Sequence, residues 1–173
     1  AIDSILSQTY KKFEFIIIDD GSTDGSLNII NEYSDERIKI LVNPKNEGLI
    51  FSLNKGIELA LGTYIVRMDA DDISLPQRIE EQVSFMEKHK EIGVCGTDIE
   101  VFGKSLNGYI HRFKRSPIAN NAALLFTTCF AHPSVIIRKS VLDQYHLCYN
   151  GVYRNAEDYG FWVEPVSYTH LTL

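Results

Sequence analysis

Short apolar runs alternate along the chain with segments whose apolar residues recur every three or four positions. The runs predict strands at residues 13–18, 37–42, 64–68, 92–96 and 134–137. The periodic segments predict helices at residues 2–6, 27–33, 49–61, 74–88, 116–126, 139–144 and 156–163, and the looser stretch 98–115 predicts a hairpin-like excursion. Strands and helices that alternate at this spacing are typical of βαβ units. We therefore expect an α/β fold with a mainly parallel sheet and helices on both faces.

Length and charge narrow the functional classes. The chain has 173 residues, which predicts one compact domain. Its formal charge of −6, with no block of basic residues, argues against nucleic-acid binding. No stretch approaches the roughly 18 consecutive apolar residues of a membrane span, and the three cysteines form no C-x-x-C pair. The sequence therefore predicts a cytoplasmic protein with reduced thiols and no transmembrane segment.

Acidic residues directly follow two of the predicted strands. Asp19 and Asp20 come after the first strand, and the acidic group Asp69–Asp72 comes after the third. A single Asp at a strand end is most often a turn former or a helix N-cap. In an open parallel sheet, however, ligands bind beyond the carboxyl ends of the strands, and both groups are expected at that edge. Because carboxylates packed together repel one another, the pattern favours a divalent cation site.

Asp69 and Asp71 form a D-x-D pair that suits a hard cation. One or two carboxylates leave coordination positions open to water or phosphate oxygens, which is how Mg²⁺ or Mn²⁺ is commonly carried with a diphosphate. No His or Cys stands in the group, which disfavours zinc. The chain also lacks G-x-G-x-x-G after a strand and G-x-x-x-x-G-K-[ST], which excludes the dinucleotide-binding and P-loop classes.

A series of motifs then follows in order along the chain. They comprise Ser4–Tyr10, Ile16–Asp24, Asn46–Gly48, Asn54–Ile57, Gly62–Ile65, Asp69–Asp72 with Leu75–Arg78, His132–Ser134 and Ala156–Trp162. Together they resemble the inverting family-two glycosyltransferases, and the resemblance covers residue 1 to about residue 162. It implies the Rossmann-like GT-A fold and transfer of a sugar from a nucleotide-diphosphate donor to a hydroxyl acceptor.

The resemblance also implies roles on the donor side. Asp20 is expected to hydrogen-bond the nucleotide base, and Asp69 to contact the ribose or a metal-bound water. Asn46 and Asn54 are expected to belong to the same nucleotide-sugar site. Leu53 stands where many members of that family carry Arg, so one phosphate contact of the family is not expected here.

Catalysis is expected from two further carboxylates. Asp71, together with Asp69, is expected to bind Mn²⁺ or Mg²⁺ on the donor diphosphate. Asp158 is expected to be the general base that takes the proton from the acceptor hydroxyl. Acceptors of the family are often polysaccharides or lipid-linked sugars, which implies a role in cell-surface polysaccharide or glycolipid synthesis. Peripheral association with the inner face of the membrane is compatible with that role.

Both ends of the chain depart from the family pattern. The first strand of the family is absent before Ala1, so an incomplete sheet and an incomplete nucleotide pocket are expected. Residues 1–164 are expected to form the transferase domain, truncated at both ends. Residues 165–173 are expected to be a non-native or unstructured tail.

Two other functions remain as alternatives. A nucleotidyltransferase uses a related fold with an acidic metal site, and a phosphorylation-receiver domain also carries acidic strand ends. Individual residues also keep simpler interpretations. Trp162 is either a sugar platform or a core residue, and His132 is more often structural than catalytic. Arg78 is expected either to pair with the acidic group or to be solvated on its helix.

Overall fold

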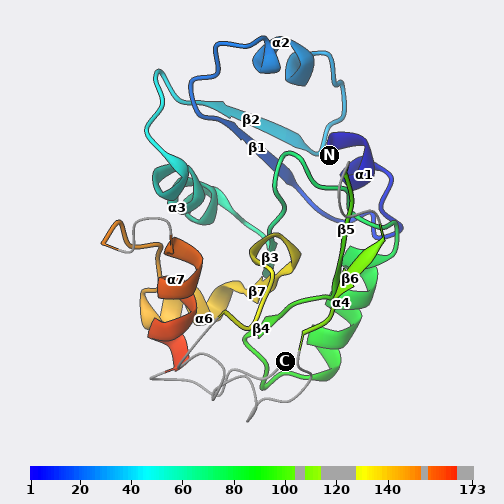
Figure 1. Ribbon diagram of the computed structural model, residues 1–173, viewed down its shortest axis with the longest axis vertical. Coiled ribbons are helices and arrows are strands. Elements are labelled where there is room, and N and C mark those ends of the chain that lie inside the picture. Colours follow the sequence, from blue (N-terminus) through cyan, green and yellow to red (C-terminus); the bar gives the residue numbers. More distant parts are fainter. Residues whose placement is uncertain (104–107, 114–127, 153–155, 167–173) are drawn as a thin grey trace.

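The computed structural model describes residues 1–103, 108–113, 128–152 and 156–166, in which helices and strands alternate (Figure 1). The helices are α1 (Ile2–Leu6), α2 (Ser26–Asn31), α3 (Leu49–Leu59), α4 (Arg78–Lys88), α6 (Lys139–Tyr145) and α7 (Glu157–Val166), with a short 3₁₀ helix η1 (His132–Ser134). The strands are β1 (Phe15–Asp19), β2 (Ile38–Val42), β3 (Tyr64–Val66), β4 (Val94–Cys95), β5 (Ile99–Val101), β6 (Tyr109–His111) and β7 (Ile136–Arg138). The predicted α/β class is confirmed, but among the described strands the pairing is mixed and not mainly parallel, because only β1 and β2 pair in parallel.

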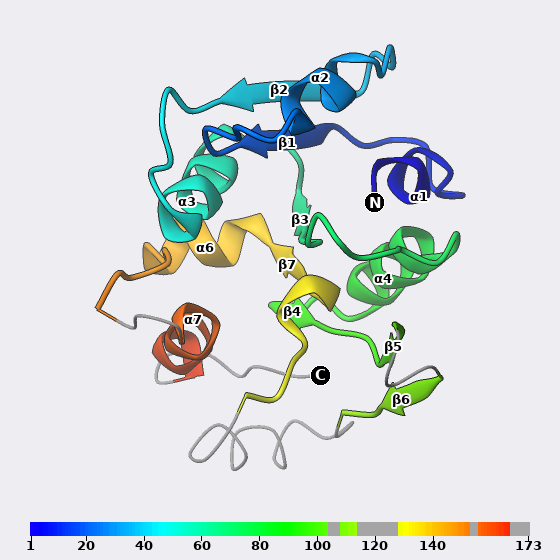
Figure 2. The ribbon, with the colours of Figure 1, turned by 45° about the horizontal axis from the view of Figure 1, so that its top comes forward.

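Strands β1 and β2 form a parallel pair, with Phe15 opposite Ile38 and Asp19 opposite Val42. Parallel neighbours need a crossover connection, and the segment containing α2 supplies it. Figure 2 shows this pair above β3, with α2 beside β2. Because both strands end at the same edge, the polar residues that follow them lie next to one another.

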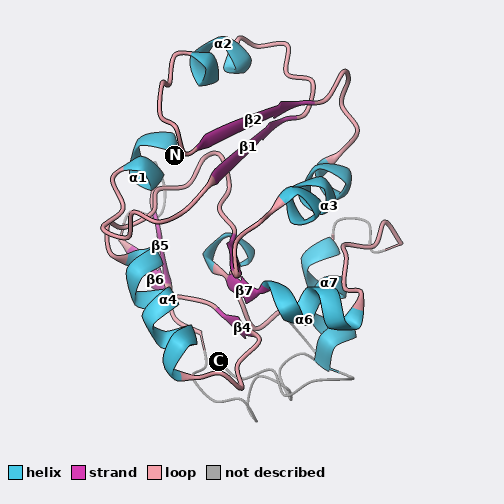
Figure 3. Ribbon diagram, turned by 180° about the vertical axis from the view of Figure 1, so that it is seen from behind, coloured by secondary structure: helices cyan, strands magenta, loops and turns pink. Residues whose placement is uncertain are grey.

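Strand β7 lies between β3 and β4 and runs antiparallel to both. Successive side chains of a strand point to opposite faces of its sheet. Accordingly, Ile136 packs in a cluster with Met86 of α4, whereas Ile137 packs in a cluster with Leu142 of α6 and Trp162 of α7. Figure 3 shows α4 on one side of this sheet and α6 and α7 on the other. The prediction of helices on both faces is confirmed.

Helix α1 is tied to the segment that leads into α4. The fully buried side chain of Gln8, just after α1, donates from Nε2 to the Leu75 carbonyl at 2.8 Å and to Ser74 Oγ at 3.1 Å. Its Oε1 accepts the Ile79 N–H at 3.0 Å. Residues 74–77 are therefore held as a loop, and α4 begins at Arg78 instead of at residues 74–76 as predicted.

The remaining predictions have mixed outcomes. The hairpin-like excursion is confirmed, because β5 and β6 pair antiparallel with Ile99 opposite His111. Helix α7 continues to Val166, past the predicted end at residue 163, with Pro165 in its last turn. The predicted helix at 116–126 and residues 167–173 of the predicted tail lie outside the described residues.

The three cysteines are free and differ in accessibility. Cys148 is exposed, Cys95 is half-buried and Cys129 is buried. Burial raises the pKa of Cys95 and of Cys129 to about 11. No helix in the described part of the chain has the length and apolar character that a membrane crossing requires.

Candidate functional site

Asp20, just beyond the end of β1, holds the loop that connects β2 to α3. Its Oδ1 accepts the Asn43 side-chain amide at 2.7 Å and the Glu47 N–H at 3.0 Å, and its Oδ2 accepts the Gly48 N–H at 2.8 Å. Hydrogen bonding from Asn43, aided by the two backbone N–H groups, holds the pKa of Asp20 below its ordinary value. Asp20 is thus an ionised, oriented carboxylate at the edge of the parallel pair.

Gly21 lets the same loop approach the end of β1 closely. A Cβ at Gly21 would lie 2.5 Å from the carbonyl carbon of Lys45 and 2.7 Å from the backbone nitrogen of Asn46. The φ of Gly21 is +70°, in the left-handed region that favours glycine. The side chain of Asn46 is exposed on this loop, next to the Asp20 carboxylate that the loop surrounds.

The D-x-D segment follows β3 and carries a buried counter-charge. The side chain of Arg67 is only 10% exposed, and its Nη1 donates to Asp69 Oδ2 at 2.9 Å while its Nη2 forms an ion pair with Asp69 Oδ1. Asp71 is exposed. Burial raises the pKa of Asp72, and the negative charges of Asp69 and Asp71 raise it further. The three carboxylates therefore form one repelling group that Arg67 only partly neutralises.

Arg78 supports this segment from α4. Its Nη2 donates to the Arg67 carbonyl at 2.7 Å, and its Nε donates to Gln82 Oε1 at 3.2 Å. Burial lowers the pKa of Arg78 to about 10, and the charge of Asp72 acts in the opposite direction. Arg78 is therefore neither solvated nor directly paired with a carboxylate. It braces the backbone of the strand end through a carbonyl and influences the acidic group through its charge.

Asp158 lies in the first turn of α7. Its side chain is half-buried, and its Oδ1 accepts the Tyr159 N–H at 2.7 Å. Trp162, one turn further along, is fully buried and packs against Phe130 and Phe161, with ring centroids at 5.2 and 5.0 Å. Trp162 is thus a core residue and offers no exposed face to a sugar.

His132 and Tyr149 connect Asp158 electrostatically with the D-x-D segment. His132 Nε2 lies 2.7 Å from the Tyr149 hydroxyl. Burial lowers the pKa of His132 to about 4, the charge of Arg67 lowers it further, and Asp158 opposes both. Burial also raises the pKa of Tyr149; the charge of Arg67 opposes this rise, and the charges of Asp158, Asp69 and Glu157 add to it. The buried phenol is therefore sensitive to charges of both signs.

Asn54 holds the same tyrosine from α3. Its Nδ2 donates to the Tyr149 carbonyl at 2.9 Å, and its Oδ1 accepts the Tyr149 N–H at 2.8 Å. The side-chain amide predicted for the nucleotide-sugar site is thus engaged with the backbone of another segment. Among the contacts of the described residues, none joins Asp20 directly to Asp69 or Asp158.

Sequence reasoning missed Arg67 and Tyr149, and it did not identify the role of Gln8. For Tyr149 the sequence carries one weak signal, an alternation in residues 147–150 that the structure shows as buried, exposed, buried and exposed. For Arg67, a cation two residues before a D-x-D pair signals a counter-charge. Gln8 belongs to the Ser4–Tyr10 motif, but its contact with Ile79 is formed only in the folded chain.

The acidic group offers oxygen donors but no complete metal site. In the described part of the chain, no three His, Cys, Asp or Glu side chains are placed to hold a metal ion. The exposed carboxylate of Asp71 and the partly exposed carboxylate of Asp69 are hard oxygen donors of the kind that Mg²⁺ and Mn²⁺ prefer. Such a pair suits a cation whose other ligands are phosphate oxygens and water.

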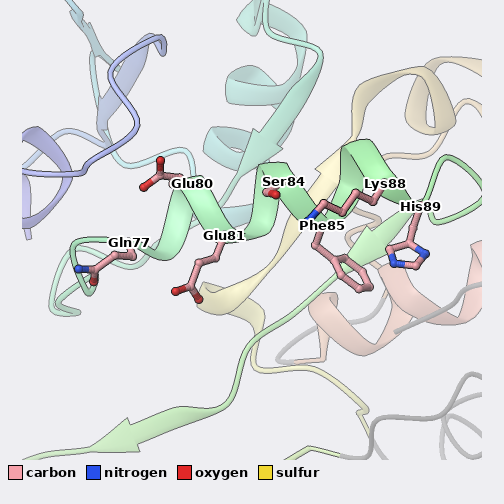
Figure 4. A pocket seen from close by; sticks show the side chains of 7 residues that line it. All are labelled: Gln77, Glu80, Glu81, Ser84, Phe85, Lys88 and His89. Atoms are coloured by element: carbon pink, nitrogen blue, oxygen red, sulfur yellow. The ribbon is translucent and has the colours of Figure 1, made fainter.

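An open hollow occurs elsewhere, along α4 (Figure 4). It is lined by Gln77, Glu80, Glu81, Ser84, Phe85, Lys88 and His89, on the side of the helix away from the buried residues Ile79, Gln82 and Met86. None of its lining residues belongs to the predicted site. The hollow therefore adds nothing to the chemistry of the strand ends.

Structures of known proteins resemble this arrangement. The S. aureus TarS fragment 1–349 in complex with UDP superimposes with a TM-score of 0.74 at 23% identity, over 92% of this chain and 48% of that chain. The mannosyltransferase PcManGT from Pyrobaculum calidifontis, in complex with GDP-Man and Mn²⁺, gives a TM-score of 0.62 at 18% identity, over 83% of this chain and 41% of that chain. At these identities the likeness shows the fold alone, which is the GT-A fold.

Sequence comparison extends the likeness to the family. An uncharacterized glycosyltransferase from Haemophilus influenzae is 39% identical over 175 residues, covering 95% of this chain and 54% of the relative. The O-antigen biosynthesis glycosyltransferase WbnJ from Escherichia coli is 35% identical, covering 94% of this chain and 64% of the relative. The chain thus spans between about half and two thirds of the length of these relatives. The family model described as glycosyl transferase family 2 matches residues 1–145. The chain therefore belongs to glycosyl transferase family 2.

Proposed function

We propose that the protein transfers a sugar from a nucleotide-diphosphate donor to a hydroxyl acceptor, with inversion at the anomeric carbon and with a divalent cation. The observation that carries this proposal is the geometric link that Tyr149 makes between two acidic elements. Its hydroxyl lies 2.7 Å from His132 Nε2 of η1, and just after η1 the Val135 carbonyl accepts the N–H of Arg67, which holds Asp69. Its ring stacks on Phe161 of α7, the helix that carries Asp158 in its first turn. Membership of glycosyl transferase family 2 supports the same reaction class.

Asp158 is the proposed general base. An alcohol is a poor nucleophile, so a carboxylate within hydrogen-bond reach must accept its proton as the new C–O bond forms. This assistance contributes about 10²–10⁴ in rate. Asp158 presents a half-buried carboxylate from the first turn of α7. A single base on the acceptor side fits direct displacement opposite the leaving group, which inverts the anomeric carbon.

Asp71 and Asp69 are the proposed ligands of the cation. A divalent cation held there would neutralise the negative charge that gathers on the leaving nucleoside diphosphate. Asp71 is exposed and free to turn toward the donor, whereas Asp69 is held by Arg67. Arg67 fixes the orientation of Asp69 at the strand end. The proposed site uses Mn²⁺ or Mg²⁺, and Mn²⁺ accompanies GDP-Man in the PcManGT structure.

Asp20 and Asn46 are proposed to bind the nucleotide base. Asp20 is ionised and already oriented by Asn43, Glu47 and Gly48, so a base N–H needs no rearrangement of the carboxylate to bind it. Asn46 adds an exposed amide on the adjoining loop. The domain is proposed to extend over residues 1–164.

The biological setting is proposed from the relatives. WbnJ is named for O-antigen biosynthesis and AmsE from Erwinia amylovora for amylovoran biosynthesis. WfaP from Escherichia coli is named a UDP-Glc:alpha-D-GlcNAc-diphosphoundecaprenol beta-1,3-glucosyltransferase, so its acceptor is lipid-linked. We infer a saccharide or lipid-linked acceptor for this protein and a role in cell-surface polysaccharide synthesis. Contact with the inner face of the membrane follows from an acceptor of that kind.

A donor screen with two variants tests the proposal. The purified protein is incubated with Mn²⁺ and with UDP-glucose, UDP-GlcNAc or GDP-mannose, and release of the nucleoside diphosphate is measured. Asp158→Asn is expected to lower turnover of the preferred donor about 10²–10⁴-fold while UDP binding persists. Asp71→Asn is expected to remove the Mn²⁺ dependence of UDP binding. Asp143→Asn, an exposed change on α6, is the matched control. Turnover by Asp158→Asn equal to that of the unmodified protein would refute the proposed role of Asp158.

A further inference from the structure

Tyr149 lies where three elements meet. Its side chain is only 4% exposed, although the residue belongs to the irregular segment that follows α6. Its backbone is bound by Asn54 of α3, its hydroxyl by His132 of η1, and its ring by Phe161 of α7. Three different kinds of contact thus fix the backbone, the hydroxyl and the ring of one residue.

The contact with α3 connects Tyr149 to the residues that are proposed to bind the nucleotide base. Helix α3 starts after Gly48, whose N–H donates to Asp20, and Asn54 lies six residues further along. At the rise of an α-helix this separation is about 9 Å. The two hydrogen bonds from Asn54 to the backbone of Tyr149, here called the clamp, therefore fix the position of Tyr149 relative to the end of β1.

The contact with α7 leads to the proposed general base. The rings of Tyr149 and Phe161 are stacked, with centroids 4.2 Å apart and an interplanar angle of 14°. Phe161 and Asp158 are three residues apart on α7, and residues at this spacing are neighbours on one face of a helix. A shift of the Tyr149 ring therefore moves the face of α7 that carries Asp158.

The contact with η1 leads to the strand that precedes the D-x-D pair. His132 Nε2 lies 2.7 Å from the Tyr149 hydroxyl. Just after η1, the Val135 carbonyl accepts the N–H of Arg67 at 3.1 Å, and Arg67 holds Asp69. The hydroxyl of Tyr149 is thus linked to the end of β3 through one short segment.

We propose that Tyr149, clamped by Asn54, is a positioning residue that sets the place of Asp158 relative to Asp20 and Asp69. This inference rests on the proposed function, because it assigns Asp158 the role of general base. It gives Asn54 a different task from the donor contact that its motif implies. Asn54 acts through Tyr149, and Tyr149 acts through α7.

Steady-state kinetics with the preferred donor of the screen distinguish two possible roles of Asn54, which are positioning Tyr149 and binding the donor. Asn54→Leu removes both clamp bonds, and Tyr149→Phe removes only the hydroxyl. If they act through position, each lowers kcat about 10- to 100-fold and leaves KM for the donor within about threefold. If Asn54 is instead a donor ligand, Asn54→Leu raises KM at least tenfold with kcat retained, and the inference is overturned. Tyr145→Phe, on α6 against the same apolar cluster, is the matched control.

Hydrogen exchange gives a readout that needs no donor. Asn54→Leu is expected to speed exchange of the α7 amides at least tenfold and to leave the α4 amides unchanged. Equal exchange in α7 of the variant and the unmodified protein would overturn the inference. The result for Asp158→Asn tests the proposed function independently of the positioning role. Full turnover by that variant refutes the general base, whereas an inactive Asp158→Asn beside a fully active Tyr149→Phe and Asn54→Leu refutes only the positioning role.

Discussion

Gly21 occupies a position where any side chain would collide with the backbone of a neighbouring segment. An added Cβ would meet Lys45 and Asn46, which belong to the loop that brings the exposed Asn46 amide next to Asp20. The positive φ at Gly21 adds a second requirement for glycine, since L-residues are disfavoured there. Gly25 shares the positive φ but has open space around it, so the two glycines separate the two effects.

Gly21→Ala is therefore expected to reduce the free energy of unfolding by about 2–4 kcal/mol, the sum of the backbone cost and the displaced loop. Gly25→Ala is expected to cost about 1 kcal/mol, from the backbone alone. Urea unfolding of both variants measures the difference. Equal destabilisation of the two would show that the contact between Gly21 and residues 45–46 contributes nothing.

His132 makes stability depend on pH. Burial lowers its pKa from 6.5 to about 4, so between these values the unfolded chain binds a proton that the folded chain does not. Stability is then complete above about pH 6.5 and falls as the pH drops toward 4, by up to about 3 kcal/mol. Arg37 lowers the pKa of Asp35 from 3.8 to about 2. The stability that Asp35 contributes is therefore lost only as the pH falls from about 3.8 toward 2.

We expect His132→Gln to flatten the fall in stability between pH 6.5 and pH 4, because glutamine does not titrate. Unfolding free energies measured at half-unit pH intervals test this expectation. His111→Gln, an exposed change on β6, is the control and should leave the slope as it is. An unchanged slope in His132→Gln would assign the pH dependence to other groups.

At the scale of elements, α1 positions the segment that precedes α4. The segment contains Ser74 and Leu75, and it begins two residues after Asp72. Helix α1 is too short to be stable alone, so its own order depends on these contacts. The buried amide of Gln8 satisfies groups on both sides, because it also donates to the Ser4 carbonyl at 3.0 Å.

Gln8→Ala is expected to reduce the free energy of unfolding by about 2–4 kcal/mol, because it leaves the Ile79 N–H and the Leu75 carbonyl without their partner. Gln77→Ala, an exposed glutamine beside the same helix, should change stability by less than about 0.5 kcal/mol. Thermal or urea unfolding compares the pair. A Gln8→Ala variant as stable as Gln77→Ala would show that the segment is held by other contacts.

At the scale of the whole molecule, the β1–β2 pair and the β3–β7–β4 sheet are joined mainly by helices and side chains. The β1–β2 pair and the β3–β7–β4 sheet share no strand pairing in the described residues. Helix α3 contacts β1 and, through Asn54, the segment after α6. The Glu14 carboxylate, beside β1, accepts the N–H groups of Leu61 and Gly62, just before β3. The relative place of the two sheets is thus fixed by specific polar contacts.

Hydrophobic periodicity predicted best the elements that bury an apolar face, because the spacing of that face is visible in the sequence. Strand β7 with Ile136 and helix α4 with Ile79 and Met86 are examples, whereas α2 and β6 contain no buried residue. The predicted family is confirmed. Element boundaries were predicted less accurately where contacts with distant residues determine them. The start of α4 at Arg78 is an example, because Gln8 holds the loop before it. The acidic strand ends predicted the candidate site, and that site stays a prediction. The bonds that hold Arg67 to Val135 and Arg78, and the clamp on Tyr149, join residues distant in sequence, so the local signals at these two residues do not predict their partners.

Cys148 offers a way to observe the tyrosine beside it. Its thiol is exposed, whereas burial shifts the ionisation of Cys95 and Cys129 to about pKa 11 and leaves both largely unreactive near neutral pH. A thiol-specific fluorophore or spin label therefore attaches selectively at residue 148 without any cysteine being removed. The natural sequence thus carries its own labelling handle next to Tyr149, and motion of that segment during turnover becomes measurable by spectroscopy.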